Sequence, residues 1–131
     1  MPELSFSAEQ ASIAIEWEGD GSGDFLMSVE VRADEFRGHA DGHVAGADFR
    51  RFAKALEDLE RNRKGAATLE SALPGEFTVT VKAIDGVGHM GVLGVLRYCR
   101  PGREWPQQEL NFAFEFDPSQ LHAAVGAANA A

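Results

Sequence analysis

The segment LNFAFEF near the end of the chain constrains the fold most. It places Leu110, Phe112, Phe114 and Phe116 at alternate positions, with polar or small residues between them. Side chains of a β-strand alternate between the two faces of a sheet, so this spacing puts three aromatic rings on one face. The Asp-Pro pair that follows ends the run, because proline cannot continue the ladder of hydrogen bonds. The chain therefore needs a hydrophobic core against one face of a sheet.

The same alternation predicts six further strands. Two pairs of them are separated by the turn sequences GDGSGD and DGVG, which are typical of hairpin connections. The third predicted strand carries small residues at positions 38, 40 and 42, so we expect the next element to pack closely against them. The six strands are expected at 13–17, 25–31, 36–44, 66–71, 77–83 and 90–96.

Between the third and fourth of these strands the period changes to that of a helix. Phe49, Phe52, Leu56 and Leu59 form one apolar stripe, which predicts an amphipathic helix over about 46–63. Basic residues follow in its last turn, and Gly65 is the expected residue just beyond its end. After the final strand, SQLHAAVGAANAA predicts a short helix that frays from residue 126.

These elements predict an α+β fold in one domain that covers residues 1–131, with 126–131 as a frayed tail. All connections are short, which favours antiparallel neighbours. We expect a meander sheet of about seven strands, with the long helix packed on one face and a short C-terminal helix. The sheet edges carry no obvious proline or lysine guard, so a homo-oligomer could form through them.

Charge and cysteine content limit the partners and the compartment. Twelve Lys and Arg against 21 Asp and Glu give a net charge of −9, the wrong sign for holding a phosphate backbone, so we expect no nucleic-acid partner. The acidic surplus suits a basic partner, although many proteins are acidic only for solubility. A lone Cys99 forms no internal disulfide, and the chain shows neither an export signal nor a membrane span, so we expect a cytoplasmic protein.

The sharpest local group of polar residues is His39, Asp41 and His43. Alternate residues of a strand point the same way, so these side chains would share one face and could bind zinc. The alternative is that they are simply the polar residues of a solvated strand face. The sequence offers no fourth ligand, and the prediction is therefore no metal and no cofactor.

No catalytic motif is recognisable, and we expect a binding protein that is not an enzyme. A nucleophile elbow, a phosphate-binding loop and a dinucleotide fingerprint are all missing from the sequence. Three residues are candidates for partner contact. Trp105 lies between prolines in a loop and could anchor a partner or pack as a lid, whereas Glu57 and Asp58 lie on the polar face of the long helix.

The order of segments resembles a known family. The helix DFRRFAKALEDL is followed by ATLES, then GEFTVTVKAIDGVGHMGVLGVL, then LNFAFEFDPSQLHAAV. This order is similar to the WapI-type immunity family, named for wall-associated proteins, and to related bacterial domains of unknown function. The likeness covers about residues 25–125, and its most telling parts are Asp48-Phe49 and Phe52 in the helix, the segment Leu69-Glu70-Ser71, and Gly88-His89 at the start of a strand.

The resemblance implies a small cytoplasmic protein that binds the effector domain of a polymorphic toxin and blocks it by contact. Many such toxins are nucleases with basic grooves, which an acidic protein could fill by charge complementarity. Two other functions stay open from the sequence. One is a domain that binds a small ligand or metal through His39, Asp41 and His43, and the other is a housekeeping domain.

Overall fold

The strands of the protein form two antiparallel sheets of four strands each, in a computed structural model that describes residues 2–72, 76–99, 102 and 107–131. Sheet A has its strands in chain order: β1 (Glu3–Ala8), β2 (Ala11–Gly19), β3 (Phe25–Ala33) and β4 (Phe36–Val44). Sheet B also follows chain order: β5 (Ala66–Glu70), β6 (Phe77–Ala83), β7 (Met90–Cys99) and β8 (Gln107–Phe116).

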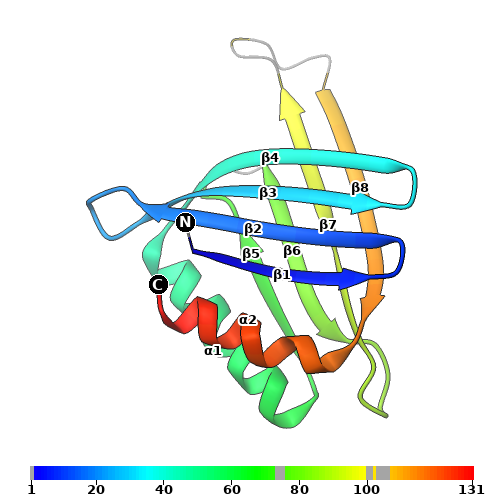
Figure 1. The fold of residues 1–131 in the computed structure, drawn as a ribbon. Helices are drawn as coiled ribbons and strands as arrows, with labels where there is room; N and C mark the ends of the chain where they lie inside the picture. Colours follow the sequence, from blue (N-terminus) through cyan, green and yellow to red (C-terminus); the bar gives the residue numbers. More distant parts are fainter. Residues whose placement is uncertain (1, 73–75, 100–101, 103–106) are drawn as a thin grey trace.

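Helix α1 (Gly46–Asn62) links the two sheets, and the short 3₁₀ turn η1 (Pro118–Gln120) leads into helix α2 (Leu121–Asn129) after β8. The strands of sheet A run across those of sheet B, and both helices lie on one side of the molecule (Figure 1). Helix α1 packs on β5 and α2, while α2 packs on β1. The helices therefore close the side where the edge strands β1 and β5 lie.

The α+β class predicted from the sequence is confirmed. The structure has eight strands in place of about seven, because β1 was not predicted, and they divide between two sheets. Leu4 and Phe6 of β1 are buried and alternate with exposed residues, which is the pattern that identified the other strands. No helix among the described residues is long and apolar enough to span a membrane.

Aromatic contacts join helix α1 and strand β8 to sheet A. Phe116 of β8 packs on Phe6 of β1, with ring centroids 4.3 Å apart, and so lies against sheet A. Phe49 of α1 lies 5.0 Å from both Trp17 and Phe25, which also belong to sheet A. Phe49 of the helix therefore packs on sheet A, and Phe116 of β8 joins sheet B to sheet A.

The small residues of β4 are covered by sheet B, not by the helix that follows them. A Cβ added to Gly42 would lie 2.7 Å from Cε2 of Phe77, and one added to Gly38 would lie 2.5 Å from Cδ2 of Leu110. The expectation that the next element packs there is therefore wrong. The reason is that α1 turns away to the side, which leaves β4 facing the strands of sheet B.

The ends of the two helices differ from the local signals in the sequence. Helix α1 has no side-chain cap of its own; instead Asp24, in the turn between β2 and β3, accepts a 2.8 Å hydrogen bond from the Gly46 amide. At its other end Arg63, rather than Gly65, is the left-handed capping residue, with φ of 57°. The predicted fraying point at residue 126 falls inside α2, which continues to Asn129 and buries Ala128 against the core.

At Ser7, a side chain bonds the free backbone edge of β1. The Gln120 amide side chain accepts a 2.8 Å hydrogen bond from the Ser7 amide and donates one of 2.8 Å to the Ser7 carbonyl. This contact satisfies backbone groups that an edge strand would otherwise offer to another chain.

Candidate functional site

The outer face of sheet A is open and rich in carboxylates. Its inward residues, such as Ile15, Trp17 and Val29, are buried, so the residues between them point outward. We call the outward carboxylates of sheet A the acidic face: Glu3, Glu16, Glu18, Glu30 and Asp41.

The register of the strands gathers these carboxylates in cross-strand rows. One row runs from Glu3 through Glu16 and Ser28 to Asp41, and the next brings Glu18 beside Leu26. Glu3 and Glu16 are directly opposite each other, an arrangement in which like charges destabilise the sheet. At the other end of the sheet Arg32 and Arg37 face each other. The outer surface of sheet A is therefore negative at one end and positive at the other.

Most of these carboxylates have no partner within the described part of the chain. Glu3, Glu16, Glu18 and Glu30 make no side-chain hydrogen bond or ion pair there. By contrast, the long helix pairs its acids: Glu57 lies 3.0 Å from Arg61 and Asp58 lies 3.3 Å from Lys54. The negative charge of sheet A is therefore available to a partner, whereas that of α1 is largely compensated.

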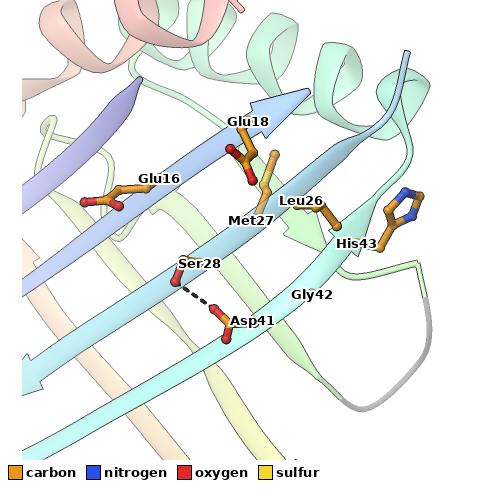
Figure 2. A pocket seen from close by; sticks show the side chains of 8 residues that line it. All are labelled: Glu16, Glu18, Leu26, Met27, Ser28, Asp41, Gly42 and His43. Carbon is orange, nitrogen blue, oxygen red and sulfur yellow. Dashed lines mark hydrogen bonds between the residues drawn. The ribbon is translucent and has the colours of Figure 1, made fainter. Parts of the chain in front are cut away.

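A shallow hollow of about 490 Å³ lies on this face. Figure 2 shows Glu16 and Glu18 on β2 and Asp41 on β4, with β3 between them. The side chain of Leu26, which is 48% exposed, adds apolar surface. The hollow is lined by Glu16, Glu18, Leu26, Met27, Ser28, Asp41, Gly42 and His43.

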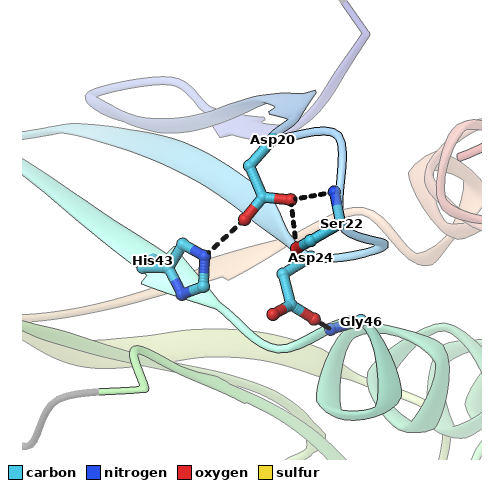
Figure 3. A network of polar contacts seen from close by, with 5 residues as sticks. All are labelled: Asp20, Ser22, Asp24, His43 and Gly46. Carbon is cyan, nitrogen blue, oxygen red and sulfur yellow. Dashed lines mark hydrogen bonds and ion pairs between the residues drawn. The ribbon is translucent and has the colours of Figure 1, made fainter.

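Beside the hollow, a polar network joins the β2–β3 turn to β4 and α1 (Figure 3). Asp20 accepts hydrogen bonds from the Ser22 amide at 2.8 Å and the Ser22 hydroxyl at 2.6 Å, and its other oxygen lies 2.8 Å from Nε2 of His43. Asp24 bonds the first turn of α1 through Gly46. The turn that sequence suggested as a simple hairpin connection therefore also anchors the helix and the end of β4.

The predicted group of His39, Asp41 and His43 does not form a single site, because its two histidines bind different partners. Nε2 of His39 lies 2.7 Å from the Ser28 hydroxyl and 3.1 Å from Asp41, while His43 turns to Asp20. Within the described ranges, the group of three side chains whose ligand atoms converge, all within 4.8 Å of one another, is Asp20, Asp24 and His43. Two carboxylates and an imidazole are donors that divalent metals accept, although each already makes a hydrogen bond in the network of Figure 3.

The candidate contact residues from the sequence lie apart from the acidic face. Glu57 and Asp58 are on α1, and Trp105 lies outside the described residues. Sequence reasoning did not single out Glu16 and Glu18. Their signal was present in the segment Ile13–Glu18, where acidic residues alternate with buried apolar ones, but their neighbours on other strands depend on register.

The Asp20–His43 pair makes the folding stability depend on pH. The Asp20 carboxylate raises the pKa of His43 above its ordinary value, while the Ser22 hydroxyl, followed by His43, lowers the pKa of Asp20. The histidine contribution is therefore fully present below its unfolded pKa and is lost as pH rises through its raised folded pKa. The aspartate contribution is present above its unfolded pKa and is lost as pH falls through the lowered one.

We therefore expect Asp20→Asn to lower the pKa of His43, measured by NMR titration of the imidazole ring protons. Asp85→Asn is the matched control, because Asp85 raises the pKa of His89 in the same way in another turn. It should lower the pKa of His89 and leave that of His43 unchanged. A His43 pKa that is the same in the wild type and in Asp20→Asn would show that the contact is absent in solution.

A shallow, open acidic surface suits another macromolecule better than an enclosed small ligand. The model of the immunity protein WapI-like family matches residues 3–131, and the chain belongs to this family. The match confirms the resemblance recognised over 25–125 and extends it to β1 and the GDGSGD turn. No curated protein and no solved structure matches the chain significantly. Membership of this family suggests an immunity protein, with a toxin in general as its protein partner.

Proposed function

We propose that the chain neutralises a cognate toxin by direct contact and without chemistry, and that the acidic face is the surface that makes the contact. The observation that carries this proposal is the set of unpaired carboxylates on one open sheet face of a protein from an immunity family. We place the encounter in the cytoplasm, where the single Cys99 needs no disulfide partner.

Charge complementarity explains how such a surface would work. A toxin that acts on a negatively charged substrate needs a basic surface, and the row of carboxylates across β1, β2 and β4 offers the opposite charge. Complementary charges steer the encounter and reject partners of the wrong sign. Once bound, the protein blocks the toxin by occupying the surface that its substrate needs.

Co-expression with a candidate toxin domain, chosen from the genes that neighbour this one in its native genome, tests the proposal. Wild-type protein should restore growth and elute with the purified toxin domain as one complex. The charge-reversed variant Glu16→Lys/Glu18→Lys should associate more slowly, by about a hundredfold at low salt. Glu70→Lys/Glu115→Lys is the matched control, because both residues are exposed on the outer face of sheet B.

Three outcomes of this experiment are informative. Loss of protection by the sheet A variant alone supports the proposal. Full protection by the sheet A variant would move the contact to another surface. Absence of both protection and complex formation with the wild-type protein would reject toxin neutralisation itself.

A further inference from the structure

The hollow on the acidic face has the features of a pocket for one cationic side chain. Glu16 on β2 and Asp41 on β4 lie in the same cross-strand row, with Ser28 of β3 between them. Neighbouring strands lie about 4.8 Å apart, so a cationic group placed above Ser28 would lie between the strand that carries Glu16 and the strand that carries Asp41. Glu18 adds a third carboxylate from the next row along β2.

The carboxylates of Glu16, Glu18 and Asp41 have oxygen atoms that accept no hydrogen bond within the described residues. Glu16 and Glu18 make no side-chain hydrogen bond or ion pair within the described residues. Asp41 contacts the Ser28 hydroxyl at 2.7 Å and His39 at 3.1 Å, but both contacts use Oδ1, which leaves Oδ2 available. The nearest arginines of the same sheet face, Arg32 and Arg37, lie further along β3 and β4, beyond the row that pairs Glu30 with His39. His43 also lines the hollow, but its Nε2 is bound to Asp20. The pocket is therefore not neutralised from within the fold.

Apolar surface lies beside the charge. Leu26 is a large hydrophobic residue that is 48% exposed, and it faces Glu18 across the β2–β3 pair and His43 across the β3–β4 pair. Long basic side chains combine an apolar stem with a charged head, and they bind where a hydrophobic wall lies next to carboxylates. Among them, arginine presents a planar fork of five donors that can bond two carboxylates at once, whereas lysine is a point charge.

We propose that this hollow holds an arginine side chain of the partner, with its stem on Leu26 and its guanidinium between the carboxylates of Glu16, Glu18 and Asp41. This assignment rests on the proposed function, because it names the chemistry that the same face recognises in a toxin. An interface residue of this kind would be an anchor, since arginine is enriched among the side chains that dominate binding energy.

NMR titration of ¹⁵N-labelled protein with a synthetic peptide tests the assignment without the toxin. The probe is Ac-Gly-Arg-Gly-Arg-Gly-NH₂, and the comparison peptides carry lysine or uncharged citrulline in place of arginine. We expect saturable shifts at the amides of Leu26 and Ser28 with the arginine peptide, at least threefold weaker binding of the lysine peptide, and no saturable binding of the citrulline peptide. Equal binding of the arginine and lysine peptides would overturn the arginine assignment, and shifts confined to other residues would overturn the pocket.

Matched variants complete the test. Glu16→Gln/Glu18→Gln/Asp41→Asn should weaken the arginine peptide at least tenfold, while Glu9→Gln/Glu70→Gln/Glu115→Gln removes the same three charges from exposed positions elsewhere and should weaken it less than threefold. Equal weakening by both would mean that only net charge matters and would overturn the pocket.

If the peptide binds as expected but no toxin is neutralised, the pocket stands and the proposed function falls. If the toxin is neutralised equally by the pocket variant, toxin neutralisation stands, but the pocket falls and the contact moves to another surface.

Discussion

Replacing Phe49 by alanine should lower the free energy of unfolding by about 3–5 kcal/mol, the usual cost of removing a buried phenylalanine side chain. Phe49 is 1% exposed and its ring lies 5.0 Å from those of Trp17 and Phe25, so it holds α1 against sheet A. The cavity would open where three elements meet, and these elements cannot all close around it. Urea unfolding followed by far-UV circular dichroism measures the loss.

The matched control for Phe49→Ala is Phe36→Ala. Phe36 is 67% exposed at the start of β4, so truncating it should change the free energy of unfolding by no more than about 0.5 kcal/mol. Equal losses in the two variants would contradict the burial of Phe49 and with it the contact between α1 and sheet A.

Replacing Gly94 by alanine should also destabilise the protein strongly. A Cβ at this position of β7 would lie 2.1 Å from the carbonyl oxygen of Thr78 and 3.0 Å from Cζ of Phe112. The carbonyl belongs to β6 and cannot retreat without disturbing the ladder that pairs β6 with β7. Overpacked cores lose about 1–3 kcal/mol, and we expect this variant at the upper end of that range because the clash is with backbone.

Gly126→Ala is the matched comparison, because the same substitution should raise the free energy of unfolding at this position. Gly126 lies in α2, and a Cβ there would meet nothing within 4 Å. Alanine should therefore stabilise the protein by about 0.5–1 kcal/mol through the lower entropy of the unfolded chain and better helix propensity. A stable Gly94→Ala variant, measured by urea unfolding beside Gly126→Ala, would show that β6 and β7 do not approach as closely as described.

Much of the fold follows from local patterns. The helical spacing of Phe49, Phe52, Leu56 and Leu59 identified α1 and its buried stripe, and all four are buried in the structure. Alternation identified seven of the eight strands. The division into two sheets did not follow, because alternation shows which residues share a face of a strand but not which strands pair or which faces meet.

The candidate site could not be predicted, because it depends on strand register, which a single sequence does not reveal. Glu16, Ser28 and Asp41 are far apart in the chain and become neighbours only through the register of β2, β3 and β4. The same limit affected His43, which was grouped with His39 by spacing along one strand but bonds Asp20 of the β2–β3 turn. Asp24 as the cap of α1 is likewise a contact across 22 positions that no local helix signal contains.

Chemical-shift mapping of the protein in complex with its toxin domain tests the central claim most directly. If the acidic face is the contact surface, the largest changes will fall on Glu16, Glu18, Leu26 and Ser28, and binding will weaken as salt concentration rises. Changes confined to the outer face of sheet B or to α1, with sheet A unaffected, would contradict the account.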